Sequence, residues 1–208
     1  MGKGKRFAAA AAAVVTSVGA LALHAETSGA TNVVARAALQ NQAGQPVGEV
    51  VFKKRGREII GEVEVVLPVA GTEFRGFHIH ANDVDNHPAT PDGNAADGCI
   101  AAGGFVSVDG HWNRGGGGTH GSHTGDLPVL MRDADGHARA EFAVGKLQPG
   151  EIVGRAVVVH SVADNYANIP SRYDLTATGV AGPDATTLAN GDAGSRYACG
   201  VIVSDAEG

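Results

Sequence analysis

The sequence has few aromatic residues, only two cysteines and no excess of basic charge. Aromatic residues make up 5% of the 208 residues, whereas glycine occurs 31 times. The 16 basic and 22 acidic side chains give a net charge of −6, which argues against a nucleic-acid partner, because such a partner requires a basic face. Heptads and internal repeats are also lacking, which excludes a coiled coil and a repeat array. Abundant glycine without long helical runs favours turns and long loops around a β-scaffold.

The N-terminal segment is typical of a secretory signal peptide. Three basic residues precede an alanine-rich apolar run that ends in short residues near Ala25. A membrane anchor is the alternative reading, but so much alanine makes a weak membrane span. We expect cleavage, no stable membrane insertion afterwards, and an extracellular, periplasmic or cell-envelope location. The expected organisation is a signal peptide over residues 1–25, a polar tail over residues 26–32 and one domain over residues 33–208.

The two cysteines, Cys99 and Cys199, lie far apart in the sequence. In an exported chain an even pair most simply forms one disulfide, and two buried free thiols are the alternative. Closing a loop of this length would constrain the unfolded chain by about 4–5 kcal/mol in the chain-entropy description.

Short strand-like segments separated by Gly- and Pro-containing turns follow the N-terminal tail. Two long stretches without regular periodicity, residues 82–126 and 161–195, interrupt them, and stretches of this length are usually functional or disordered. The pattern predicts an all-β sandwich or barrel with two long functional loops. Eight strands are expected, over residues 33–41, 47–55, 57–67, 74–81, 127–133, 137–144, 152–160 and 196–203.

Histidines are concentrated at the ends of these strands and in the two long stretches. His78 and His80 alternate with apolar residues, so a strand would place both imidazoles on the same face of a sheet. Neutral imidazole binds Cu, Zn, Fe and Ni, and a carboxylate with three imidazoles in a tetrahedral set suits Zn. The candidate ligands are enough for two metal ions, particularly if one imidazole is shared: His78, His80, His111, His120, His123, His160 and Asp126.

A cupin is an alternative β-barrel that also carries an H-x-H pair. A cupin requires a glutamate a few residues after the pair, where this chain offers Asp83 or Asp85. The segment that precedes His160 also does not fit the second cupin motif. The two histidines outside the constellation, His87 and His137, are expected to be structural or solvent-exposed.

Five motifs, taken together, resemble the copper/zinc superoxide dismutase family. "GFHIH", "GHWN", "THGSHTGDLP", "GRAVVVHSVADN" and "GDAGSRYACGVI" occur in the family's order. The resemblance covers residues 33–203, and it is greatest to the exported bacterial branch, including its actinobacterial members. It implies an eight-stranded Greek-key sandwich and the conversion of superoxide to dioxygen and hydrogen peroxide by copper redox cycling. A noncatalytic copper-binding or copper-storage protein is the alternative.

The resemblance also implies one copper and one zinc ion per subunit. The imidazole of His111 would bridge the two ions and would also deliver a proton to the departing peroxide. This chain departs from the family by placing only two residues between His120 and His123. Copper would take His78, His80, His111 and His160, and zinc would take His111, His120, His123 and Asp126.

Three further features follow from the same resemblance. Asp164 matches the aspartate that hydrogen-bonds imidazoles of both metals, and such partners fix ligand orientation. Arg196 matches the arginine beside the copper, where its charge would attract the superoxide anion, and Cys99 pairs with Cys199. Members of the family dimerise through different faces, so the sequence allows a homodimer but does not establish the oligomeric state.

Overall fold

The computed structural model describes residues 32–82, 98–175 and 179–205. The expected signal peptide and nearly all of the polar tail lie outside the described residues, and so do Asp83, Asp85 and His87. Among the residues that are described, no helix has the length and apolar character needed to cross a membrane.

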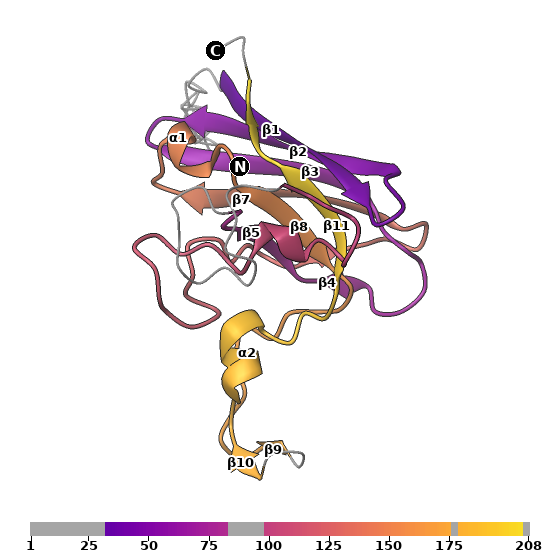
Figure 1. Ribbon diagram of the computed structural model, residues 1–208, viewed down its shortest axis with the longest axis vertical. Helices are drawn as coiled ribbons and strands as arrows, with labels where there is room; N and C mark the ends of the chain where they lie inside the picture. The colour runs from indigo at the N-terminus through magenta and orange to yellow at the C-terminus, as the bar shows by residue number, and fades with distance from the viewer. Residues whose placement is uncertain (1–31, 83–97, 176–178, 206–208) are drawn as a thin grey trace, which may run out of the picture.

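The fold is a curled antiparallel sheet of eight strands (Figure 1). Three hairpin-connected strands, β1 (Asn32–Asn41), β2 (Pro46–Arg55) and β3 (Glu58–Val66), pair in chain order. The chain then crosses to the opposite edge of the sheet before β7 (His137–Gly145) returns beside β3. This connection is a Greek key, and it confirms the all-β class expected from the sequence. The strand order is β5 (Phe77–His80), β8 (Ala156–His160), β11 (Arg196–Val201), β1 (Asn32–Asn41), β2 (Pro46–Arg55), β3 (Glu58–Val66) and β7 (His137–Gly145), with β12 (Val203–Ser204) also paired to β1.

The long loops carry short elements of their own. Two small antiparallel pairs lie outside the main sheet, and Figure 1 shows α2 and the β9–β10 hairpin projecting from the barrel. These elements are β4 (Phe74–Arg75) with β6 (Leu130–Met131), β9 (Asp174–Leu175) with β10 (Val180–Ala181), the 3₁₀ turn η1 (Val106–Val108), and the helices α1 (Pro149–Ile152) and α2 (Ala185–Asn190).

Several strand boundaries differ from the prediction. The expected strand over residues 74–81 is divided at Gly76, where an added Cβ would lie 2.6 Å from the Cβ of Ala193. The expected strand over residues 152–160 begins four residues late, because Pro149 starts a short helix with a capping box between Gln148 and Glu151. The expected strand over residues 127–133 is reduced to β6, and the last strand is divided into β11 and β12.

The core lies inside the curled sheet and positions β5. Phe77 and Ile79 are fully buried in it, and the ring of Phe77 meets that of Phe142 edge-on, with centroids 5.2 Å apart. Burying one such side chain contributes about 2–3 kcal/mol. Because side chains alternate along a strand, His78 and His80 face the other side of β5. They are nevertheless buried, since that side is covered by Asp164 and by the segment 98–127, which pairs with the free edge of β5.

Candidate metal centre

The covering segment pairs with β5 almost as an additional strand. The backbone N–H of Trp112 donates to Ile79 O at 2.8 Å, and the N–H of Ile79 donates to Gly125 O at 2.8 Å. Isolated bridges also place His80 opposite His111 and His78 opposite Asp126. This pairing fixes residues 111–126 against the histidines of β5.

The first ligand group contains His78, His80, His111 and His160, which offer nitrogen atoms within 4.8 Å of one another. Nδ1 of His80 donates to Asp109 O at 2.7 Å, and Nδ1 of His160 donates to Gly194 O at 3.1 Å. Each of these rings therefore turns Nε2 inward, and the two Nε2 atoms are 3.4 Å apart. Nδ1 of His78 and Nε2 of His111 are buried without a hydrogen-bond partner. Buried polar atoms are normally paired, so four imidazole nitrogens converge as a metal would require.

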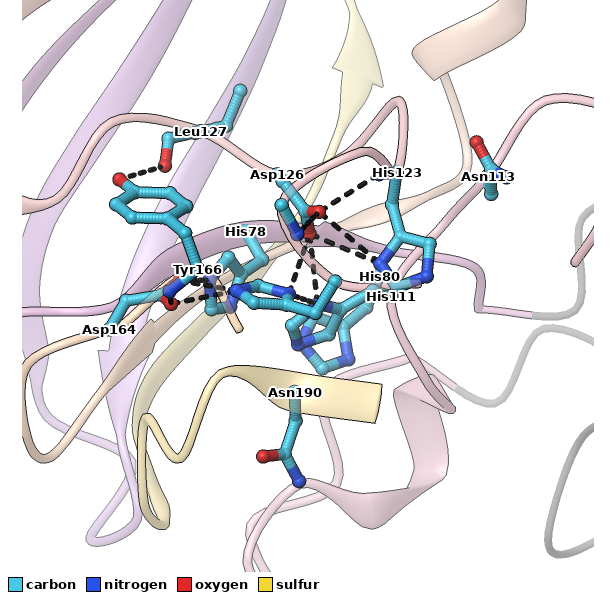
Figure 2. Close-up of polar contacts among 12 residues, drawn as sticks. His78, His80, His111, Asn113, His123, Asp126, Leu127, Asp164, Tyr166 and Asn190 are labelled. Carbon is cyan, nitrogen blue, oxygen red and sulfur yellow. Dashed lines mark hydrogen bonds and ion pairs between the residues drawn. The ribbon is translucent and has the colours of Figure 1, made fainter. Parts of the chain in front are cut away.

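The second ligand group surrounds one carboxylate oxygen (Figure 2). Oδ1 of Asp126 lies 3.1 Å from Nδ1 of His111, 3.1 Å from Nδ1 of His120 and 3.3 Å from Nδ1 of His123. Four ligands at 2.0–2.1 Å from a tetrahedral zinc ion would be separated by about 3.3 Å. The ligand atoms of His78, His111, His120 and Asp126 lie within 4.8 Å of one another, and His123 reaches this set through its contact with Asp126. Imidazoles with one carboxylate are a donor set that suits zinc. The short separation of His120 and His123 in the sequence does not prevent both rings from reaching Asp126.

Asp164 connects the two groups. Its carboxylate accepts from Nε2 of His78 at 2.5 Å and from Nε2 of His120 at 2.7 Å. The same carboxylate accepts the backbone N–H of Tyr166 at 2.6 Å, which fixes its orientation. Each bond directs Nδ1 of the histidine inward, so Asp164 selects the tautomer that a metal site needs.

Burial controls protonation in the first group. It lowers the pKa of His78 and His80, that of His111 to about 4 and that of His160 to about 3. These imidazoles are therefore neutral near pH 7, which is the form that binds a metal ion.

The second group holds a proton instead. Burial alone would lower the pKa of His120, but hydrogen bonds to Asp126 and Asp164 raise it to about 9. Burial would likewise raise the pKa of Asp126, but three imidazole contacts, from His111, His120 and His123, hold it well below its usual range. A divalent cation would displace this proton and supply positive charge in its place.

Arg196 is tied to the first group through the backbone. Its guanidinium donates to the carbonyl oxygens of Phe105 and Asp109, and Asp109 O also accepts from His80. The predicted disulfide is present, with an S–S distance of 2.03 Å between Cys99 and Cys199. It joins the segment that carries both carbonyls to β11, the strand that begins at Arg196.

Six of the seven predicted ligands lie in two sets whose ligand atoms are within 4.8 Å of one another, and the second of these sets contains His78 with His111, His120 and Asp126. His123 contacts Asp126 but is not a member of that set, in which His78 takes the place expected of His123. Asp164 contacts His78 and His120, and His137 in β7 belongs to neither set. The sequence reading did not identify Asp109 and Gly194, which orient imidazoles through carbonyl groups, or Leu188, whose carbonyl accepts the N–H of His120 at 2.7 Å. A backbone carbonyl carries no residue-type signal, so these contacts could not be found from the sequence.

Fold and site together define a Greek-key β-protein with two adjoining groups of candidate metal ligands that have His78 and His111 in common. Residues 47–202 match the copper/zinc superoxide dismutase family. The chain therefore belongs to the copper/zinc superoxide dismutase family.

Individual relatives agree with this assignment. A Cu-Zn superoxide dismutase of Mycobacterium tuberculosis is 38% identical over 135 residues, which are 63% of this chain and 53% of the relative. The chain thus spans about half the length of that relative. A Cu-Zn superoxide dismutase of Escherichia coli is 31% identical over 206 residues, or 95% of this chain and 99% of the relative. The solved Cu/Zn superoxide dismutase from Brucella abortus has a TM-score of 0.54 and 26% identity, covering 80% of this chain and 97% of that one.

Proposed function

We propose that this protein is an exported superoxide dismutase with one copper and one zinc ion. The observation that carries the proposal is the orientation of His111, whose Nδ1 faces Asp126 and whose buried Nε2 faces the all-histidine group. One imidazole can therefore serve both ions. Copper would be held by the first ligand group, and zinc by His111, His120, His123 and Asp126.

The reaction converts two superoxide ions and two protons into one dioxygen and one hydrogen peroxide. Bound copper would supply the one-electron oxidation and reduction that this requires. The chain itself must supply a proton near the reacting oxygen. Nε2 of His111 can hold that proton and donate it to the peroxide, while the contact of Nδ1 with the second group keeps the ring in place.

Arg196 is proposed to attract the substrate. With Ser161 and Ser195 it lines a hollow of about 300 Å³, and the chain as a whole is acidic, with a net charge of −6. A local positive centre is therefore needed to bring an anion to the copper. Arg196→Glu should leave copper content unchanged and lower the superoxide rate substantially. The wild-type rate should fall with added salt. An unchanged rate in the variant would show that Arg196 does not face the substrate.

The test of the copper half combines metal analysis with superoxide consumption by the purified protein. His160→Ala should lose copper and activity together, and His137→Ala is the matched control because its ring lies outside both groups. The proposal fails if superoxide disappears no faster with the copper-loaded wild-type protein than in buffer without protein. That result would identify a noncatalytic copper protein.

The zinc half has its own test. His123→Ala should lose zinc and lower thermal stability, because residues 111–126 lose the ion that holds them together, while a copper site that still turns over remains. Wild-type protein that binds one copper, no zinc and has full activity would refute the zinc assignment without touching the copper assignment.

Export is proposed from the N-terminal segment together with the disulfide. Structural disulfides form and persist in oxidising compartments, and the Cys99–Cys199 bond is consistent with one. Mass spectrometry of protein recovered outside the cytoplasm should show a new N-terminus near residue 26. Retention of residues 1–25 would support the membrane-anchor reading.

A further inference from the structure

Nearly all basic side chains of the described residues have a partner. Carboxylates pair with Arg36, Lys53, Arg55, Arg114 and Arg139. Backbone carbonyls accept hydrogen bonds from Arg75, Arg132, Arg155 and Arg196. Arg172 lies over the ring of Tyr173. Within residues 32–82, 98–175 and 179–205, the basic side chains left without any such contact are Lys54, Arg57 and Lys146.

These three side chains line one cleft. Its volume is about 350 Å³, and Gly56 and Gln148 complete the lining. Lys54 lies in β2 just before the tight turn that joins β2 to β3, and Arg57 lies in the turn itself. The register of Ile59 opposite Gly145 brings the end of β7, and hence Lys146, beside that turn. Segments far apart in the sequence thus contribute basic residues to the lining of one cleft.

The two other cations of this turn show that the exception is local. Lys53 is paired with Glu62 at 2.6 Å and Arg55 with Glu141 at 3.5 Å, both on the outer face of the sheet. Glu58 lies opposite Arg55 in the ladder and is not part of the cleft lining. Glu62 and Glu141 therefore pair with cations of the sheet face, and Glu151, which accepts the backbone N–H of Gln148 at 2.7 Å, pairs with Arg114. Among the described residues, no carboxylate forms an ion pair with Lys54, Arg57 or Lys146.

We propose that this cleft binds a phosphate dianion, either inorganic phosphate or a phosphate monoester at the end of a larger molecule. Three basic residues lining one cleft match a ligand with two negative charges and several acceptor oxygens, and both Lys and Arg bind such groups through charge-assisted hydrogen bonds. The volume exceeds that of one phosphate, which leaves room for the group that carries it. The site shares no residue with the two metal-ligand groups.

The experiment is a titration of metal-loaded protein with inorganic phosphate, followed by backbone amide NMR at constant ionic strength, with copper kept in its diamagnetic reduced state. Saturable shifts are expected at residues 54–57 and 146–148. Each of three variants should raise the dissociation constant for phosphate about fivefold, the factor that corresponds to losing one exposed charge contact. These variants are Lys54→Gln, Arg57→Gln and Lys146→Gln. Lys53→Gln, which removes a paired cation from the same turn, is the matched control and should leave it unchanged.

A second arm separates the two sources of phosphate. Vesicles of phosphatidylcholine containing phosphatidic acid, whose headgroup is a monoester, are tested by co-sedimentation with the same variants. Binding of vesicles that is lost in the cleft variants would place the phosphate on a lipid surface, and saturation by inorganic phosphate alone would identify the free ion. The proposal is overturned if neither ligand binds, if chloride reproduces the shifts, or if Lys53→Gln weakens binding as much as the three cleft variants do.

Discussion

Replacement of Gly191 by alanine should disturb the metal centre from outside its ligand set. Gly191 ends α2 with a φ of 63°, and a Cβ built there would lie 2.1 Å from Oδ1 of Asp164 and 2.4 Å from Nε2 of His120. Side-chain carbons do not approach other atoms within 3.0 Å, so Asp164 or His120 must move by about 1 Å. The movement would break or stretch the 2.7 Å hydrogen bond between them.

The magnitude has two parts. An alanine at this φ costs about 1–2 kcal/mol in the backbone alone, and losing the partner that orients a metal-binding histidine lowers metal affinity by about 10–100-fold. We therefore expect Gly191→Ala to bind zinc about 10–100-fold more weakly than the wild-type protein. Its melting temperature should also fall by several degrees.

Gly44→Ala is the matched control, because Gly44 has a φ of 73° and no atom within 4 Å of an added Cβ. It carries the backbone cost without the collision. Zinc affinity is measured by competition with a chromophoric chelator, and the coordination geometry by the visible spectrum of the cobalt-substituted protein. If both variants bind zinc equally well and give the same cobalt spectrum, Gly191 does not control the position of His120 and the reasoning fails.

Three further predictions concern stability. Replacing Cys99 and Cys199 together by serine should lower the free energy of unfolding by about 5 kcal/mol on the chain-entropy estimate for a loop of this size, because the bond closes a separation of 100 residues; a urea midpoint unchanged in the metal-free protein would contradict it. Metal-free protein should lose stability as pH falls from about 6.5 towards 3. The reason is that His111 and His160 bind protons in the unfolded chain over this range, whereas their folded pKa values of about 4 and 3 keep them neutral in the folded protein. A urea midpoint that does not change across this range would refute the burial of neutral imidazoles. The contribution of His120 has the opposite sign: its folded pKa of about 9 gives stability that is complete below pH 6.5 and lost as pH rises through 9, and in His120→Gln this alkaline loss should disappear.

The metal centre shows how far residue patterns can be carried. Ligand type and number were readable because imidazole and carboxylate have narrow chemical uses, and the alternation in β5 placed two imidazoles on one face. The same alternation does not predict that the face of β5 carrying His78 and His80 is buried. His78 and His80 are 0% and 1% exposed because residues of both long loops pack on them, with Asp164 against His78 and the carbonyl of Asp109 against His80. These contacts join segments far apart in the sequence, and a backbone carbonyl has no sequence signature.

Strand boundaries show the same division. Apolar alternation identified β1, β2, β3 and β7 within one or two residues, since each has one face in the core. It failed around Gly76, where the chain is divided into β4 and β5. Gly76 bonds there to Val162 and His160 through its backbone, and Ala193 leaves no space for a side chain at this position. Local periodicity contains no information about neighbours that are so distant in the sequence.

The sequence by itself determined the strand-rich class, the candidate metal ligands and the cysteine pair, because each depends on residue type or local period. Only the tertiary structure decided which nitrogen of each imidazole faces inward, and that Lys54, Arg57 and Lys146 share a cleft. The physical reason is that the tautomer of an imidazole and the charge around a cleft depend on atoms that only folding brings together. Carbonyl groups of Asp109 and Gly194 turn two rings, the carboxylate of Asp164 turns two more, and the β3–β7 register carries one lysine to a turn 90 residues away.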